Sequence, residues 1–315
     1  MKIVNFDKHH IPQALALALA NYEEEREAVP ALPRLTHTPD LTRFLSTGLG
    51  VAAEEDGRLL GFLCCFKPWD GAFGCAARGT FSPIHAHGAV KENRERIYRR
   101  LYQAAAEKWV AAGIGYHAIA LYAHDEQALK AFFLYGFGIR CSDAVRDLYT
   151  VQTQVVDGIR MRRLAKDEVG CIRELRVSLN AHLKKSPCFV DFGAASFQRW
   201  LEMAENRDSQ VFVAEVEEAV AAFLEVGADG ENFVTEHPAM LNICGAYCLP
   251  QYRGKGVFSN LLGYAVEQLK QQGTLLLGVD YETWNPTALG AWEKHFTAYT
   301  RSVVRRIDDG ALKGE

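Results

Sequence analysis

Several protein classes are excluded by what this sequence lacks. No apolar run reaches the roughly 20 residues that a membrane-spanning helix requires, and the opening MKIVNFDKHH contains no apolar core of the kind found in signal peptides. The 35 Lys and Arg are balanced by 39 Asp and Glu, which gives a net charge of −4. Without an excess of basic charge, neither nucleic acid nor an anionic membrane is an expected partner.

Cysteine is present but lacks the spacing of a metal site. None of the eight cysteines forms a Cys-x-x-Cys pair, and most lie in apolar, strand-like runs. We therefore expect reduced core thiols, a cytoplasmic location and no bound metal. We also expect His85, His87 and His117 to be core or polar histidines and not metal ligands. The cysteines are Cys64, Cys65, Cys75, Cys141, Cys171, Cys188, Cys244 and Cys248.

What the sequence does contain is a repeat. Its 315 residues are enough for two ordinary domains, and similar residues recur at an offset of 160 or 161 positions across a hairpin, a helix and a closing motif. This regularity predicts two copies of one domain, 1–150 and 151–315, with the boundary between Leu148 and Asp157. The matched pairs include Ala53-Glu54 with Ala214-Glu215, Phe62-Leu63 with Phe223-Leu224, Ile97 with Val257, Leu101 with Leu261, Gly113 with Gly273 and Ala128 with Ala288.

The first copy opens with a short strand and a helix. Apolar residues recur at helical spacing up to Tyr22. The acidic residues that follow predict a solvated continuation of this helix; a patch that attracts a polyamine is the alternative. Residues 51–66 predict a hairpin with its turn at Asp56-Gly57. The acidic residues are Glu23, Glu24, Glu25 and Glu27.

The chain is organised around the stretch 241–273, which predicts a strand, a basic glycine loop and a helix. Residues 242–248 are apolar and bounded by Pro250, as in a buried strand. Arg253-Gly254-Lys255-Gly256 follows. From Val257 onward apolar residues recur at helical spacing.

This loop has the composition of an anion site. Gly254 and Gly256 permit a sharp turn and close approach of a ligand, and the first N–H groups of the helix would point into the loop, with added charge from Arg253 and Lys255. The alternative is a turn that uses glycine for geometry only. Two known phosphate loops are excluded, because Gly-x4-Gly-Lys-Ser/Thr is absent and Ser259 stands where Gly-x-Gly-x-x-Gly needs its third glycine.

The stretch resembles the acyl-CoA loop of the GNAT superfamily of N-acetyltransferases. The family pattern Pro-x-x-Arg-Gly-x-Gly stands here at Pro250 and 253–256, although Phe258 replaces the last small residue of the longer pattern. Downstream, 285–288 and 292–296 resemble the family's Asn-x-x-Ala…Tyr-Glu-Lys-x-x-Phe segment, with Trp292 at the Tyr position.

The resemblance implies an α/β fold class (α+β mixed sheet). The chain would form two tandem GNAT-like domains, each a twisted mixed β-sheet flanked by helices. It also implies acetyl-CoA, or another acyl-CoA, as cofactor, with its arm between two splayed parallel strands. The implied cofactor-binding residues are Tyr247, Cys248, Leu249, Arg253, Gly254, Lys255, Gly256, Val257, Phe258, Asn285 and Trp292.

The first copy keeps the closing motif and loses the loop. Residues 125–128 with Gly136-Phe137 resemble the family's Asn-x-x-Ala…Gly-Phe motif, but Asn93-Arg94-Glu95-Arg96 stands where the glycine loop would be. Side chains there obstruct close backbone approach, and Glu95 repels phosphate. The first copy is therefore expected to lack the usual CoA site.

The catalytic residues are less clear than the loop. Many family members carry a Glu base where this chain has Cys244, and the usual Tyr acid is Trp292, whose indole N–H does not release a proton at useful pH. The remaining candidates end the second strand: Glu282 as base through water, Asp280 on the same side, and Tyr281, facing the other way, as proton donor. Solvated strand-end residues are the alternative.

These patterns favour an acyl-CoA-dependent N-acyltransferase that modifies a small-molecule or protein amine through the second copy. A non-catalytic acyl-CoA-binding or regulatory module is the first alternative, and a Fem-like aminoacyl transferase, also a duplicated GNAT-type fold, is the second. Homo-oligomerisation is left open.

Overall fold

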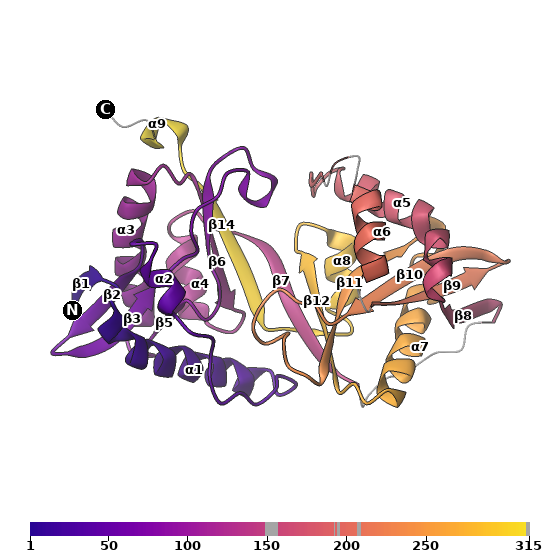
Figure 1. Cartoon of the computed structure of the whole chain (residues 1–315), viewed down its shortest axis with the longest axis horizontal. Helices are drawn as coiled ribbons and strands as arrows, with labels where there is room; N and C mark the ends of the chain where they lie inside the picture. Colours follow the sequence, from indigo (N-terminus) through magenta and orange to yellow (C-terminus); the bar gives the residue numbers. More distant parts are fainter. Residues whose placement is uncertain (149–156, 192, 194–195, 207–208, 313–315) are drawn as a thin grey trace. The chain divides into compact units, whose positions relative to one another are not determined.

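The computed structural model describes residues 1–148, 157–191, 193, 196–206 and 209–312 (Figure 1). The chain forms two compact units, Met1–Asp143 with Ala298–Glu315, and Ala144–Thr297. The predicted boundary at 150/151 lies outside the described residues. The units differ from the predicted halves in two respects. Residues from Ala144 to Leu148 belong to the second unit, and the C-terminal segment from Ala298 belongs to the first.

The first unit contains two sheets. One has the strand order β1-β2-β3-β5, and the other runs β4-β6-β14-β7. β2 and β3 form the predicted hairpin, with Asp56 and Gly57 at φ of 51° and 79° in its turn. The elements are β1 (Lys2–Asn5), α1 (Ile11–Ala28), α2 (Thr42–Leu45), β2 (Val51–Glu55), β3 (Arg58–Leu63), β4 (Gly79–Ser82), β5 (His87–Ala89), α3 (Arg94–Ala111), β6 (Tyr116–Tyr122), α4 (Glu126–Phe133), β7 (Gly138–Asp147), β14 (Thr300–Arg306) and α9 (Asp309–Leu312).

The last strand of the chain completes the first unit. β14 pairs antiparallel with β6 along its whole length, from Thr300 opposite Tyr122 to Arg306 opposite Tyr116 (Figure 1). Its Val303 is fully buried in the core around α3. This packing explains why the C-terminal segment belongs to the first unit.

The acidic end of α1 is only partly solvated, which corrects the prediction. Glu25 is 2% exposed, and its carboxylate accepts hydrogen bonds from the His124 backbone N–H at 3.1 Å and ring Nδ1 at 2.7 Å. Burial raises the pKa of Glu25. Glu24 forms an ion pair with Arg94 at 2.8 Å. The helix therefore continues through the acidic run, as predicted, but Glu25 is buried and Glu24 is paired with Arg94.

Buried histidines stabilise the first unit as polar core groups. His87 lies between the Tyr98 hydroxyl at 3.0 Å and the Ala120 carbonyl at 2.6 Å, and His117 lies between the Tyr102 hydroxyl and the Ile114 carbonyl. Burial lowers the pKa of both histidines to about 4. Each ring is therefore neutral, with Nε2–H donating to the carbonyl.

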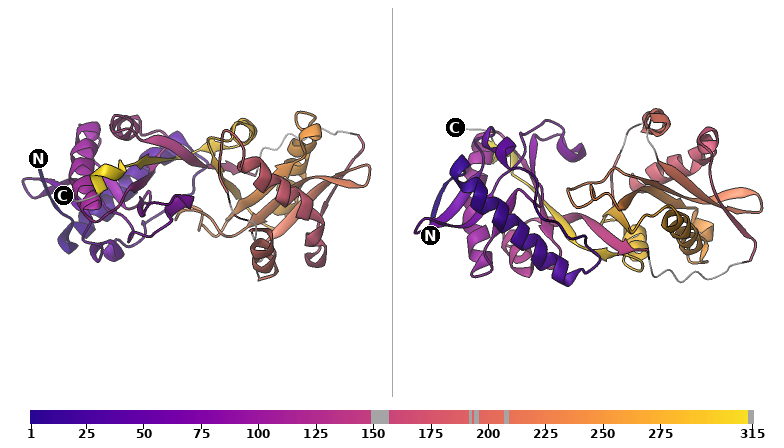
Figure 2. Two further views of the ribbon diagram at one scale, coloured as in Figure 1. Left: turned by 90° about the horizontal axis from the view of Figure 1, so that it is seen from above. Right: turned by 60° about the horizontal axis from the view of Figure 1, so that its bottom comes forward.

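The second unit is one mixed sheet with helices on both faces. Its strand order is β7-β12-β11-β10-β9-β8, with β7 contributing from Ala144 onward. Figures 1 and 2 show α5 and α6 on one face and α7 on the other. The elements are β8 (Ile159–Arg163), α5 (Arg173–Leu183), α6 (Ser196–Asn206), β9 (Gln210–Val216), β10 (Ala219–Gly227), β11 (Met240–Cys248), α7 (Val257–Gln271), β12 (Leu276–Glu282), α8 (Pro286–Trp292) and β13 (Thr297–Ala298).

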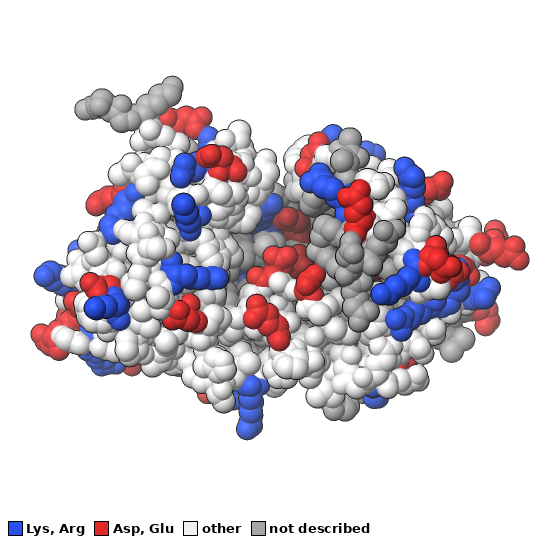
Figure 3. All heavy atoms as spheres, viewed as in Figure 1, with Lys and Arg blue, Asp and Glu red and all other residues white. Residues whose placement is uncertain are grey.

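No helix in the described ranges is both long and apolar enough to cross a bilayer. On the face drawn in Figure 3, each unit carries Lys and Arg interspersed with Asp and Glu. This mixture agrees with the nearly balanced composition.

Candidate active site

The strand, loop and helix form as predicted. β11 ends at Cys248, and α7 begins at Val257. Gly254 and Gly256 have φ of 73° and 81°, in the left-handed region that glycine tolerates best. Gly256 is the N-cap of α7, and no side chain in the described part of the chain caps this end. The first N–H groups of α7 are thus available to an anion.

Arg253 fixes the loop to the strand that precedes it. Its Nε donates to the Cys248 carbonyl at 2.9 Å, and its guanidinium lies 5.1 Å from the centre of the Tyr247 ring. Lys255 is exposed. The loop therefore carries one anchored and one solvated cation beside the helix N-terminus.

β11 and β12 pair only over their first halves. Their parallel register runs from Met240 opposite Leu276 to Ile243 opposite Val279. Beyond these residues β11 continues to Cys248 and β12 to Glu282 without pairing to each other in the described structure. This divergence is the splay that the family resemblance implies.

A cavity of about 620 Å³ borders the glycine loop. Tyr247 and Cys248 line it from β11, and Asn285 and Trp292 line it from α8 and its N-cap. Its size is within the usual range of small-molecule sites. From the loop and the start of α7, Arg253, Gly254, Gly256 and Phe258 complete this wall.

Three of the predicted cofactor residues do not line this cavity. Val257 is 3% exposed, on the buried side of α7. Leu249 packs against the apolar core formed with α5 and α6, and Lys255 points to solvent. A contact of Leu249 or Lys255 with a ligand through backbone groups, or through a mobile side chain, stays a prediction.

A second cavity, of about 430 Å³, lies at the divergence of the strands. Asp280, Tyr281 and Glu282 all border it, together with Cys244. Asp280 is exposed, Tyr281 is 4% exposed and Glu282 is half-buried. The structure thus brings the three candidates to one cavity, while their catalytic roles stay predictions.

The two cavities share a wall. Trp292 borders both, and its ring packs edge-to-face against Phe258 at 5.4 Å and Phe296 at 5.5 Å between ring centres. Its position agrees with a packing role. The residues that line both cavities are Leu179, Ala246, Asn285, Ala288 and Trp292.

A buried ion pair beside the smaller cavity was missed by sequence reasoning. Glu225 of β10 is 1% exposed and accepts from Arg176 at 2.8 Å and from the Trp200 indole N–H at 2.7 Å. The Arg176 guanidinium lies 4.4 Å from the Trp200 ring centre. Gly245 leaves room for Arg176, because a Cβ there would lie 2.4 Å from its Nη1. The sequence does contain a signal for this ion pair: Glu225 lies within the apolar run AVAAFLEVG, and a buried acid requires a partner.

His182 of α5 was also missed. Its Nε2 lies 3.2 Å from Asn285 Oδ1 and 3.1 Å from Thr287 Oγ1, and the ring lines the larger cavity. The cluster joins the last turn of α5 to the N-cap of α8. No motif marks α5 in the sequence, so only the fold reveals this contact.

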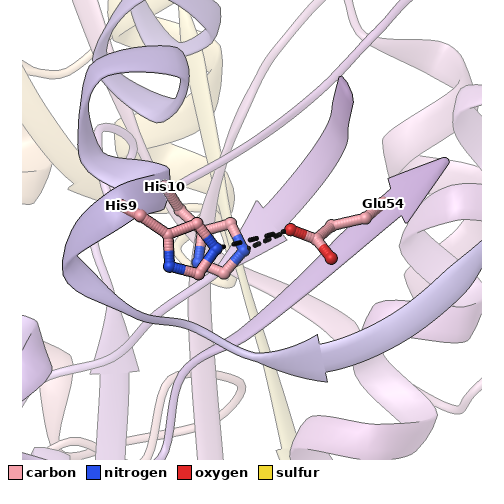
Figure 4. A group of neighbouring side chains, drawn as sticks. All are labelled: His9, His10 and Glu54. Carbon is pink, nitrogen blue, oxygen red and sulfur yellow. Dashed lines mark hydrogen bonds and ion pairs between the residues drawn. The ribbon is translucent and has the colours of Figure 1, made fainter. Parts of the chain in front are cut away.

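A histidine pair in the first unit has the ligand types of a metal site but not the required protonation. His9, His10 and Glu54 lie together in Figure 4, with their candidate ligand atoms within 4.8 Å of one another. His10 Nδ1 accepts from the Asp7 backbone N–H at 2.9 Å, so the neutral ring carries its proton on Nε2 and donates to Glu54 at 2.7 Å. Nε2 therefore has no lone pair for a metal while the Asp7 bond persists.

Comparison with known proteins supports the architecture. Residues 176–296 match the model of the Acetyltransferase (GNAT) family. No curated protein matches the chain. A GCN5-related N-acetyltransferase from Sphaerobacter thermophilus superposes with a TM-score of 0.56 at 12% identity, over 97% of this chain and 95% of that chain. A region described as a GCN5-related glucosamine N-acetyltransferase, in a fungal multi-domain GH3 beta-N-acetylglucosaminidase, gives 0.53 at 13% identity, over 96% of this chain and 38% of that chain.

The mixed sheet, its diverging parallel strands and the glycine loop define an acetyltransferase-type fold. The diverging strands and the glycine loop lie within residues 176–296, the part of the chain that matches the acetyltransferase (GNAT) family model. The first unit repeats the order of hairpin, helix, strand and helix, so the chain has a tandem GNAT architecture.

Proposed function

We propose that the chain is an acyl-CoA-dependent N-acyltransferase that works through its second unit. The larger cavity would take acetyl-CoA, or another acyl-CoA, with its pyrophosphate at the glycine loop. The smaller cavity would take an amine acceptor. The observation that carries this proposal is the shared wall: two cavities of suitable size meet where β11 and β12 diverge.

The residues present fit the cofactor. Acyl-CoA carries phosphates, which suit the uncapped N-terminus of α7 and the cations Arg253 and Lys294. When bound, it supplies an activated thioester. Backbone groups of β11 beyond its last pair with β12, on the edge that faces the divergence, are suitably placed to orient the arm and polarise the acyl carbonyl.

The acceptor chemistry needs a base. An alkylammonium group with a pKa of ~10 is almost wholly protonated at neutral pH, so its proton must leave before attack. Glu282, with Asp280 as the alternative, borders the smaller cavity and is our proposed base. Tyr281, which borders the same cavity, is the proton donor that the sequence predicts. A cytoplasmic location is part of the same proposal and rests on the eight cysteines, which are thiols and not disulfides.

The test begins with thermal-shift titration by acetyl-CoA, followed by an amine panel assayed for free CoA. We expect stabilisation by acetyl-CoA and turnover with at least one amine. Glu282→Gln should then remove the acidic limb of the kcat/KM profile, with Asp280→Asn as its matched comparison. No stabilisation by acetyl-CoA would contradict the proposal.

A non-catalytic acyl-CoA-binding module is the second candidate. It is favoured by Trp292, which packs against Phe258 and Phe296 at the position where the family commonly has a tyrosine acid. Stabilisation by acetyl-CoA without turnover of any amine would favour this candidate. A Fem-like aminoacyl transferase is less well supported, because such a protein would not need the glycine loop.

A further inference from the structure

We propose that His182 is the proton donor to the departing CoA thiolate. The inference rests on the proposed acyl transfer. It replaces Tyr281 as the proton donor, because Tyr281 borders the smaller cavity and does not line the larger one, and it assigns a role that Trp292 is chemically unable to perform. His182 lies in the last turn of α5 and lines the larger cavity.

The hydrogen bonds fix which ring nitrogen is available. Asn285 Oδ1 receives the Ala288 N–H at 3.4 Å and the Thr287 hydroxyl at 2.6 Å, so it is an acceptor. His182 Nε2 faces that oxygen and must carry a hydrogen. Since the Thr287 hydroxyl hydrogen is already donated, its oxygen also accepts from Nε2. Nδ1 is consequently the nitrogen that gains and loses a proton.

His182 lies near the end of the larger cavity that meets the smaller one. Asn285, to which His182 is bonded, lines both cavities, as does Leu179 one turn earlier on α5. Acyl transfer must occur where the two cavities meet. His182 thus stands beside the junction, with its ring centre 6.4 Å from that of Tyr247 on β11.

His182 lies at the C-terminal end of its helix. The C-terminal end of a helix stabilises a positive charge, and α5 ends at Leu183. Lys184, next along the chain, is paired with Asp191 at 2.7 Å, while Lys185 is exposed. The other titratable or charged groups that line the same cavity are Tyr247, Cys248, Tyr252, Arg253, Lys294 and His295.

The step balances without another reactant. The amine nitrogen forms a bond to the acyl carbon, and the carbon–sulfur bond breaks. The electron pair goes to sulfur, which takes the proton from Nδ1–H of the His182 imidazolium. The ammonium proton leaves separately through the base. The second proton, which the nitrogen loses as it becomes an amide, restores the His182 imidazolium, so the net products are the amide, CoA thiol and one proton.

His295 offers a matched control in the same cavity. Its Nε2 lies 3.4 Å from the Ser259 hydroxyl in the first turn of α7, at the loop end. Burial lowers the pKa of His295, so its ring is mostly neutral at pH 7. His295 is therefore expected to influence CoA affinity and not proton transfer.

The experiment compares His182→Gln, His182→Ala and His295→Gln with the full-length chain, using acetyl-CoA and the amine that gives the fastest CoA release. Glutamine keeps an N–H donor for Asn285 but does not titrate. We expect His182→Gln to lower kcat by about 100-fold, within the usual range for a general acid, with acetyl-CoA affinity by calorimetry unchanged. The decline of kcat at high pH should disappear in this variant and persist in His295→Gln.

The outcomes separate this proposal from the function on which it rests. Full activity and an unchanged pH profile in His182→Gln, with loss only in His182→Ala, would mean that the residue merely positions Asn285 and would overturn the inference. Wild-type binding of acetyl-CoA without turnover would overturn both this inference and the acyltransferase function.

Discussion

The two copies differ most at the start of their central helix. α3 begins at Arg94 and α7 at Val257, yet both helices end before a glycine with positive φ, Gly113 at 73° and Gly273 at 86°. At the 160-residue offset, residues 94–96 correspond to 254–256. The segment that forms a loop in the second copy is therefore the first turn of a helix in the first copy.

Arg94 shows what the change does to the first copy. Its guanidinium is buried and donates to Glu24 at 2.8 Å and to Asp125 at 3.1 Å. Asp125 caps α4 as Asn285 caps α8. The Arg94 side chain thus lies at the N-terminal end of α3. At the corresponding end of α7, no side chain of the described residues caps the first N–H groups. Where the two glycines are absent, an internal ion-pair cluster therefore stands in place of the anion loop.

The two copies also differ in the strand that precedes this helix. In the second unit, β11 remains one strand through the splay. In the first, its counterpart is divided between two sheets, with β4 parallel to β6 and β5 antiparallel to β3. We expect this difference, together with the closed loop, to leave the first unit without the usual CoA site.

The largest expected effect is on stability and concerns β14, the C-terminal strand that pairs within the first unit. Val303→Asp should lower the free energy of unfolding by more than about 4 kcal/mol, because it buries an unpaired charge in the core. Urea unfolding followed by circular dichroism measures the loss. Arg306→Gln, at an exposed position of the same strand, is the control; equal stability of the two variants would refute the β14 pairing.

The second prediction concerns the stability of the first unit at low pH. Burial lowers the pKa of His85, His87 and His117 to about 4, against 6.5 in the unfolded chain. Between these values the unfolded chain binds protons that the folded unit does not, so stability present above pH 6.5 is lost as pH falls toward 4. Each histidine contributes on the order of 3 kcal/mol to this loss.

The measurement is the urea midpoint from pH 7 to pH 4. His117→Gln should flatten the decline, and His37→Gln, at an exposed position, should leave it unchanged. A wild-type midpoint that stays constant over this range would contradict the burial of neutral histidines.

The glycine loop gives the third prediction. Gly256→Glu adds bulk and negative charge at a residue with φ of 81°. We expect CoA affinity to fall by at least about 100-fold, or ~2.7 kcal/mol, while the fold is retained. Arg96→Glu is the matched control, because Arg96 corresponds to Gly256 at the 160-residue offset. Unchanged affinity in Gly256→Glu would refute the site assignment.

Trp292 gives the smallest effect. Because it packs against Phe258 and Phe296, Trp292→Phe should keep activity within roughly tenfold of wild type, since a lost general acid costs ~10²–10⁴. Steady-state kinetics with acetyl-CoA measures the change. A larger fall in kcat at unchanged CoA affinity would indicate that the indole does more than pack.

The sequence predicted the elements that depend on local signals. Gly254 and Gly256 marked the loop, and the apolar spacing after Val257 marked α7. It did not predict the place of β14, because strand pairing between residues as distant as Thr300 and Tyr122 leaves no local pattern. His182 was missed for a similar reason, since its bond to Asn285 spans 103 positions.

The second copy has an open glycine loop for CoA, and the corresponding position of the first copy is closed by side chains. Calorimetric titration of the full chain with CoA tests this difference most directly. We predict one CoA per chain, with binding lost in Gly256→Glu and retained in Arg96→Glu. Two equivalent sites per chain, or a single site that survives Gly256→Glu, would contradict it.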